Sequence, residues 1–365
     1  MYKKILSLCF TILIISCGKD ENGGSSSKKD DFNRKQMLTF WADEMIIPAY
    51  KDFQTKVIDL ETKVNTFTSE TPTDANLLAV QTAWETAYVA WQKVSLFQVG
   101  KAQELNMAGN CNTYPTSVTR LQQYITDQDY NLSSPNLQDV QGFPAIDYLV
   151  NGINDPIAFY TSNAEKEQYK KYLKDITTRI ASLTNQVVDD WQNQFRTAFI
   201  DNDGYTSTSS TDVLVNYYVI PFYEKQFREN KIATPSGVRT DIPVPESVEA
   251  YYKKDISKKL YITALNATKD FYKGVGFNGN KGQSLQQYLE FLDKKDLAEL
   301  INAKFDILTE KSNALGDDFV AQIATDKSKM LDTFDAIQQV LRQGFKPDMM
   351  SALSITNTST DADND

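Results

Sequence analysis

The stretch SNAEKEQYKKYLKDITTRIASLTNQVVDDWQNQF at residues 162–195 decides the fold class of this chain. Its apolar residues return every three or four positions, so they lie on one face of a long helix. Ser162, with Glu165 three residues later, has the pattern of a capping box, and we expect the helix to begin there. The apolar face consists of Tyr169, Leu173, Ile176, Ile180, Leu183, Val187, Trp191 and Phe195.

The same spacing recurs along the chain, and no persuasive run alternates apolar and polar residues as a strand would. Further stripes are Val80, Trp84, Ala87, Tyr88, Trp91 and Val94; Leu260, Ile262, Leu265 and Phe271; and Leu297, Leu300, Ile301, Phe305 and Leu308. The polar stretch at 201–211 interrupts the pattern. The sequence therefore predicts an all-α protein with two helical-bundle domains, at residues 36–203 and 211–347.

A faint internal repeat supports this division. The sequence IPAY at 47–50, followed by Phe53, is echoed by VIPFY at 219–223, followed by Phe227. Two related helical units would give such matches, so we interpret the two bundles as products of an ancient duplication.

The N-terminus has the pattern of a lipoprotein signal peptide at residues 1–16. Lys3 and Lys4 precede an apolar run that ends at Ile15 and is too short to span a bilayer. The sequence IISC at 14–17 has the form of a lipobox, so we expect Cys17 to be acylated; a plain cysteine within an ordinary signal is the alternative. We predict an outer-membrane lipoprotein, on the periplasmic face or at the cell surface, attached to the membrane through Cys17.

Both ends of the chain are polar. Residues 17–35 are mostly Gly, Ser, Lys and acidic residues, and we expect a flexible tether there. We interpret residues 348–365 as an acidic tail. With 38 Lys and Arg against 48 Asp and Glu, the net charge is −10. Such a charge excludes a nucleic-acid partner and favours a cationic ligand or a metal ion.

Histidine is absent from all 365 residues, and cysteine occurs three times. A site built on imidazole is therefore impossible. Cys9 lies in the signal and Cys17 is the lipidation candidate, which leaves Cys111 without an intrachain partner. With no histidine to activate its thiol, Cys111 is better read as a small core residue.

The segment QGFPAID at 141–147 carries the main functional pattern. It resembles the Gly-x-His-x-x-Glu motif of the imelysin-like family, with Gly142 in place, Pro144 where the histidine stands and Asp147 where the glutamate stands. Proline suits the first turn of a helix. The order of other matching segments supports the resemblance: IPAYKDF at 47–53, AWETAYVAW at 83–91, SLF at 95–97, NTYP at 112–115, KIATPSG at 231–237, VEAYY at 248–252 and the acidic ending at 348–365.

The resemblance implies two linked all-α bundles and a site between them. The family, which includes imelysin, insulin-cleaving membrane protease-like and iron-regulated protein A-like members, is described as metallopeptidases and is linked to iron uptake. A zinc peptidase needs N or S ligands that this chain lacks, so we expect no zinc and no catalytic residues. Oxygen ligands including Asp147 would suit iron or calcium.

The sequence therefore predicts a binding lipoprotein with an interdomain cleft, associated with uptake of iron or another metal and working beside an outer-membrane transporter or other envelope protein. An organic or peptide ligand, a scaffold lipoprotein without a pocket and, as the least favoured, a peptidase remain alternatives. The candidate ligand-binding residues are Asp147, Gly142, Pro144, Trp84, Trp91, Ser95, Tyr114 and Lys231.

Some of these candidate residues can also be explained by a purely structural role. The tryptophans lie on a helical stripe that is typical of a core, and Asp147 can be a solvated residue of a helix start. If the site exists, we expect Asp147 in an exposed first turn at the junction, close to the helix at 84–95 and the turn at 231–237. The glycine-rich segment at 274–282 matches neither a Walker loop nor a dinucleotide fingerprint. The segment DNDG at 201–204 lacks the closing glutamate of a calcium loop.

Overall fold

The structure is a computed structural model that describes residues 30–356. The signal peptide, Cys17, most of the tether and residues 357–365 of the tail lie outside the described residues. Phe32 and the described residues after it form one compact unit. Within this part of the chain every regular element is a helix, and strand-like pairing is limited to a bridge between Val275 and Lys281. No helix among the described residues is long and apolar enough to cross a bilayer.

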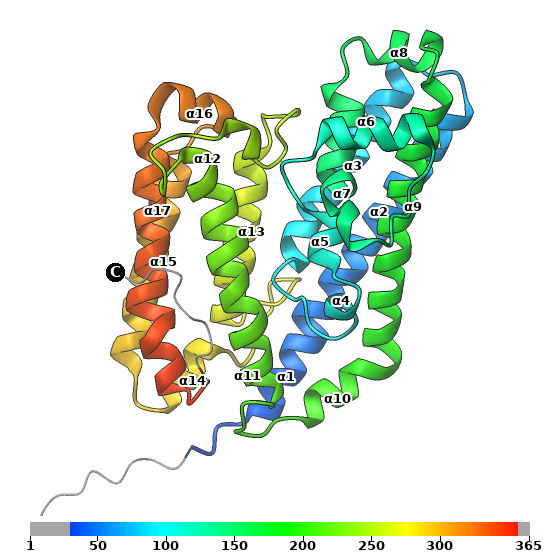
Figure 1. Ribbon diagram of the computed structural model, residues 1–365. Helices are drawn as coiled ribbons and strands as arrows, with labels where there is room; N and C mark the ends of the chain where they lie inside the picture. Colours follow the sequence, from blue (N-terminus) through cyan, green and yellow to red (C-terminus); the bar gives the residue numbers. More distant parts are fainter. Residues whose placement is uncertain (1–29, 357–365) are drawn as a thin grey trace, which may run out of the picture. The chain divides into compact units, whose positions relative to one another are not determined.

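The N-terminal bundle is built on three long helices, α2 (Ile47–Ser69), α3 (Asp74–Val94) and α9 (Lys166–Asp190) (Figure 1). Helix α2 lies between the other two and packs on both. The remaining elements are α1 (Arg34–Phe40), η1 (Trp41–Ile46), α4 (Lys101–Glu104), α5 (Met107–Cys111), α6 (Val118–Asp127), η2 (Pro135–Val140), α7 (Gly142–Asp147), η3 (Tyr148–Gly152), α8 (Pro156–Ser162), η4 (Trp191–Phe195) and α10 (Arg196–Asp201).

The C-terminal bundle packs α15 (Lys295–Asn313) against α17 (Ser328–Val340), with η6 (Phe222–Ala233) and α13 (Ser257–Lys273) completing it (Figure 1). The remaining elements are α11 (Ser210–Leu214), η5 (Val215–Val219), α12 (Thr234–Ser236), η7 (Pro245–Ser247), α14 (Leu285–Phe291), α16 (Phe319–Asp326), η8 (Leu341–Met349) and α18 (Met350–Ala352). The prediction of an all-α protein of helical bundles is confirmed.

The capping-box prediction for the start of the long helix was wrong. Helix α9 begins at Lys166, and Ser162 is instead the last residue of α8, where its hydroxyl donates to the Ala158 carbonyl at 2.7 Å. The side chain of Asn163 accepts from the Glu165 N–H at 2.8 Å. The turn between the two helices is therefore held by Asn163, a residue that forms such local hydrogen bonds readily.

The predicted stripes form the core except at some of their edges. The α9 residues from Tyr169 to Val187 that we assigned to the stripe are buried, whereas Leu300 on α15 is 40% exposed. Three further stripe residues are only partly buried, namely Phe195, Ile262 and Leu297. The two repeat segments occupy similar settings. Tyr50 and Tyr223 are both buried, and each donates its hydroxyl to a carbonyl of its own bundle, that of Phe97 or that of Ile337.

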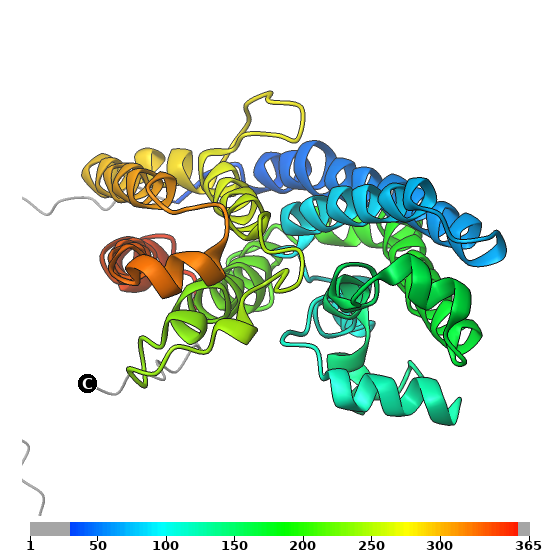
Figure 2. The same cartoon turned by 90° about the horizontal axis from the view of Figure 1, so that it is seen from above.

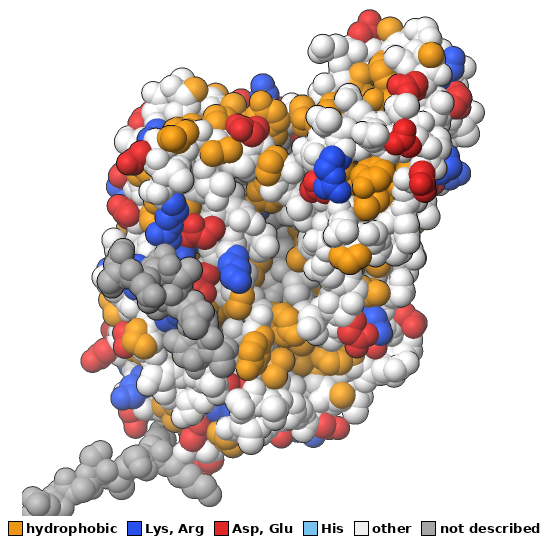
Figure 3. All heavy atoms as spheres, viewed as in Figure 1, with side chains coloured by type: hydrophobic (Ala, Val, Ile, Leu, Met, Phe, Trp, Pro, Cys, Tyr) orange, Lys and Arg blue, Asp and Glu red, His pale blue; other side chains and the backbone are white. Residues whose placement is uncertain are grey.

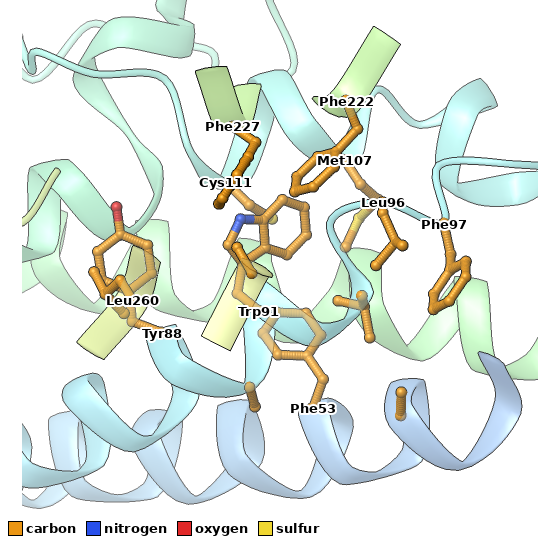
Figure 4. Close-up of a cluster of buried hydrophobic side chains, with 14 of the residues drawn as sticks. Phe53, Tyr88, Trp91, Leu96, Phe97, Met107, Cys111, Phe222, Phe227 and Leu260 are labelled. Carbon is orange, nitrogen blue, oxygen red and sulfur yellow. The ribbon is translucent and has the colours of Figure 1, made fainter. Parts of the chain in front are cut away.

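The two bundles meet where α3 packs against α13. Figure 4 shows Trp91 among apolar side chains from both sides of this junction, with Phe53 and Cys111 from one bundle and Phe222 and Phe227 from the other. The rings of Phe53 and Trp91 are 5.6 Å apart. Burial of such large apolar surfaces is the main favourable term in folding, so this cluster fixes the bundles against each other.

The described part of the tail also packs on the body. The chain from Asp348 to Thr356 continues the last helices, and Met349, Met350 and Leu353 are buried. The start of the acidic tail is therefore part of the folded protein.

Candidate functional site

A cleft lies at the junction of the two bundles, beside the segment that resembles the family motif. Its volume is about 190 Å³. Figure 3 shows one face of the molecule, which is hollowed between the bundles and carries hydrophobic side chains along the hollow. The walls of the cleft are Tyr114, Pro115, Thr116, Pro144 and Asp147 from the N-terminal bundle, and Glu246, Val248, Ala250, Tyr251 and Tyr252 from the C-terminal bundle.

Asp147 is almost fully buried, with 1% of its surface exposed. Its Oδ2 accepts from the Tyr252 N–H at 2.9 Å. Its Oδ1 accepts from the Lys253 N–H at 3.1 Å and from the Asn151 amide at 2.9 Å. The expectation of an exposed residue in a first turn was wrong, because Asp147 is the sixth residue of α7 and faces a turn of the other bundle.

The turn that meets Asp147 is shaped to present these two N–H groups. Ala250 and Lys254 flank it with φ values of 60° and 63°, in the left-handed region that side chains rarely adopt. Successive N–H groups in such a turn point to one side and form a site for an anion. Asp147 therefore joins the two bundles through backbone hydrogen bonds. Burial raises the pKa of Asp147 to about 7, although these hydrogen bonds act to lower it.

We expect Asp147→Asn to destabilise the protein by about 1–3 kcal/mol at pH 5, because the amide leaves one N–H of the turn unpaired. The pKa of Asp147 is higher in the folded protein than in the unfolded chain. The protonated carboxyl therefore stabilises the fold fully at a pH below the pKa of the unfolded chain, and this stabilisation is lost as the pH rises through about 7. Asparagine does not titrate, so the penalty should be smaller at pH 8 than at pH 5. Urea unfolding of both proteins at the two pH values measures this, and a larger penalty at pH 8 would contradict it.

A buried network of polar side chains lies behind the cleft. Lys231 forms an ion pair with Glu249 and donates to the Gln92 Oε1 at 2.8 Å. The Glu249 Oε1 accepts from the side-chain amides of Gln92 at 2.9 Å and Asn112 at 2.8 Å. The Tyr88 hydroxyl completes the chain by donating to the Asn112 Oδ1 at 2.5 Å.

This network also crosses the junction, because Gln92 and Asn112 come from one bundle and Lys231 and Glu249 from the other. Burial lowers the pKa of Lys231, and the charge of Glu249 opposes that shift. The ammonium and carboxylate need each other, since each would be costly to bury alone.

Tyr114 connects the network to the cleft. It lines the cleft and also a cavity of about 10 Å³ beside Gln92 and Lys231. Its hydroxyl is buried and has no hydrogen-bond partner among the described residues. Burial, with the nearby charge of Glu249, raises its pKa well above the ordinary value, so the hydroxyl is neutral and able to donate.

The other candidate residues have settings typical of the core. Trp84 donates from its indole N–H to the Phe143 carbonyl at 3.0 Å, which fixes α7 on α3. Gly142 has a φ of 78°, and a Cβ there would lie 2.3 Å from the Cys111 carbonyl oxygen. Trp91 and Ser95 are buried and line the cavity of about 10 Å³ with Lys231. Of the candidates, only Tyr114, Pro144 and Asp147 line the cleft.

The donors do not fit a metal ion held by Asp147. Both of its oxygens accept hydrogen bonds from N–H groups, and the Glu249 oxygens are engaged by three side-chain donors. Among residues 30–356 no three His, Cys, Asp or Glu side chains come together as metal ligands would. A hard cation needs several oxygen donors, so no metal-dependent step is assigned to this cleft.

Sequence reasoning missed Glu249, Gln92 and Asn112 as members of the site. Glu249 and Asn112 lie in segments that carry the family resemblance, but nothing in those segments distinguishes a buried glutamate from a solvated one. Only contacts in the folded protein identify these residues as members of the site. The hydrogen bond between Lys231 and Gln92, for example, joins residues that are 139 positions apart.

The chain matches a known protein family, and its fold is similar to solved structures. The model of the family described as Peptidase_M75: Imelysin matches residues 46–344. No curated protein matches the chain. A solved structure of an imelysin-like protein from Psychrobacter arcticum is 16% identical, with a TM-score of 0.71, and the match covers 90% of this chain and 97% of that one. A second, of a putative iron-regulated protein A precursor from Parabacteroides distasonis, is 18% identical, with a TM-score of 0.68 and coverage of 87% and 97%.

Proposed function

Since this chain belongs to the imelysin family, we propose that it is a ligand-binding lipoprotein of the outer membrane that takes part in iron acquisition and binds a small organic cation in the junction cleft. The lipobox at Cys17 supports the membrane attachment. The fold shared with a putative iron-regulated protein A precursor supports the link to iron. The absence of histidine argues against a zinc peptidase.

The chemistry of the walls favours a cation. The carboxylate of Glu246 lines the cleft, together with the rings of Tyr114, Tyr251 and Tyr252, whereas the oxygens of Asp147 are engaged by N–H groups. Carboxylates pair with ammonium or guanidinium groups, and aromatic faces attract the same cations. The nearby Lys253 ammonium pairs with Asp255 at 2.8 Å, so its charge is directed to that partner.

The buried hydroxyl of Tyr114 is the observation that carries the proposal. A buried polar atom without a partner costs free energy, and such atoms are uncommon in native proteins. Tyr114 lines both the cleft and the small cavity beside Lys231. A phenolic hydroxyl also accepts hydrogen bonds, so an N–H of a bound ammonium or guanidinium group would satisfy it.

We expect agmatine, which carries both an ammonium and a guanidinium group, to bind the purified protein in a calorimetric titration. Tyr114→Phe and Glu246→Gln should each weaken the binding about tenfold, since a hydrogen bond or ion pair to a charged ligand is worth about 1.5–3 kcal/mol. Tyr217→Phe removes the hydroxyl of an exposed tyrosine and serves as the matched control.

Calcium chloride and ferric citrate are titrated in parallel. Suppose that calcium or iron binds, that this binding is lost in Glu246→Gln and that agmatine does not bind. The ligand of the cleft would then be a metal ion and not an organic cation. Growth of the source bacterium with and without iron tests the second half of the proposal, because an iron-acquisition protein should increase when iron is scarce. An unchanged protein level would contradict that role.

A scaffold role is the second candidate, and two observations favour it. The hydrogen bonds of Asp147 to the turn at 250–254 and the apolar cluster around Trp91 both hold the bundles in one arrangement (Figure 4). A protein that binds neither agmatine nor the metal salts would fit this role.

A further inference from the structure

A second and larger cavity, of about 260 Å³, lies between the bundles and has no residue in common with the junction cleft. It is bounded by the loop at 274–282, which projects from one side of the molecule in Figure 2 (yellow). Its walls are Met45 and Ala49 from η1 and α2, Lys93 and Phe97 from α3, Thr263, Asn266, Ala267 and Asp270 from α13, and Val275, Gly276 and Phe277 from the loop.

The loop is a fixed wall. The Phe277 N–H donates to the Glu44 carbonyl at 2.6 Å, and the Asn280 side chain donates to the Glu44 carboxylate at 2.8 Å. Gly276 permits a close approach here, because a Cβ would lie 2.2 Å from the Asn280 Oδ1 and 3.0 Å from the Glu44 carbonyl oxygen. The glycine-rich segment thus holds Phe277 over this cavity.

Two opposite charges line the cavity from different helices. The Lys93 ammonium lies 4.9 Å from the centre of the Phe277 ring, and it forms no ion pair within the described residues. The Asp270 carboxylate is half-buried and has no hydrogen-bond or ion-pair partner there either. Burial raises the pKa of Asp270, against the influence of the lysines around it. A cation bound at Asp270 would offset that cost of burial.

We propose that this cavity binds a small zwitterion with an apolar side chain, namely a free α-amino acid, whose carboxylate pairs with Lys93 and whose ammonium pairs with Asp270. The two protein charges are already held apart on α3 and α13, so little ordering is needed on binding. The apolar walls of Met45, Phe97 and Phe277 receive the side chain.

The volume agrees with a ligand of this size. Pockets for drug-sized molecules measure about 300–1,000 Å³, and this cavity is slightly below that range. Mixed apolar and charged walls fix both the orientation and the position of a ligand, because the apolar groups supply contact area and the charges fix the ends. A metal ion is a poor alternative, since a single carboxylate faces a lysine here.

Calorimetric titration of the purified full-length protein with leucine, N-acetylleucine and leucine methyl ester tests the assignment. Leucine should bind at least tenfold more tightly than either blocked form, because each lacks one of the two charges. Lys93→Met should weaken leucine at least tenfold and leave leucine methyl ester unchanged. Asp270→Asn should weaken leucine and leave N-acetylleucine unchanged.

Lys259→Met is the matched control. It removes a charge from the same helix, α13, whereas the Lys259 ammonium pairs with Glu85 at 2.8 Å and does not line the cavity. Thermal unfolding of each variant confirms that it is folded. The proposal is overturned if leucine, isoleucine and phenylalanine all fail to bind the wild type at millimolar concentration, or if both charge variants bind leucine as the wild type does.

Discussion

Lys231→Met should lower the free energy of unfolding by about 3–5 kcal/mol, which is the usual cost of leaving one partner of a buried ion pair alone. The side chains of Lys231 and Glu249 are 3% and 4% exposed, so water cannot replace the missing partner. The variant keeps the two amide donors of Gln92 and Asn112 on Glu249 but removes its counter-charge. Urea unfolding at pH 7 measures the change.

Two further variants separate the ion pair from general damage to the junction. Lys231→Met combined with Glu249→Gln removes both charges and retains hydrogen bonding at position 249, so it should recover most of the lost stability. Lys259→Met removes an exposed ion pair with Glu85 across the same junction and should cost no more than about 1 kcal/mol. A double variant no more stable than Lys231→Met alone would show that uncompensated charge is not the cause.

The sequence was sufficient to predict the bundles, because a period of 3.6 residues is a local property of the chain. Leu173 and Ile176 are buried where the stripe places them. The same reasoning fails at the edges of a stripe. Leu300 has the right spacing, but it lies at the margin of the face that α15 buries and is 40% exposed.

The site was only partly predictable, because its partners are distant in sequence. The resemblance identified Asp147, and its position at the junction is as expected. Its burial is not visible in the sequence, because that burial depends on a turn 105 residues away whose left-handed residues are Ala250 and Lys254. Glycine would have indicated such a turn, and alanine and lysine do not.

The glycine-rich loop is a further case in which local pattern and tertiary role differ. The glycines at 274–282 join two helices and do not follow a strand, which is the context that a phosphate loop needs. In the structure Gly282 is needed because a Cβ would lie 2.1 Å from the Phe40 ring, and Gly276 because of Asn280. Close contacts within the fold, and not a ligand, account for these two residues.

Cys17→Ala should leave a soluble or unprocessed protein in place of the lipid-anchored one, and this is the largest effect that we predict. The acyl chains on Cys17 are the attachment that the lipobox implies, and each buried methylene contributes about 0.8 kcal/mol. No helix among residues 30–356 is able to span a bilayer in their place. Detergent-phase partitioning and alkaline extraction of membranes measure the change. Cys9→Ala, which alters another cysteine of the same N-terminal segment, is the matched control and should stay in the membrane fraction. If Cys17→Ala partitions into the detergent phase as the wild type does, lipidation at this residue is not what attaches the protein.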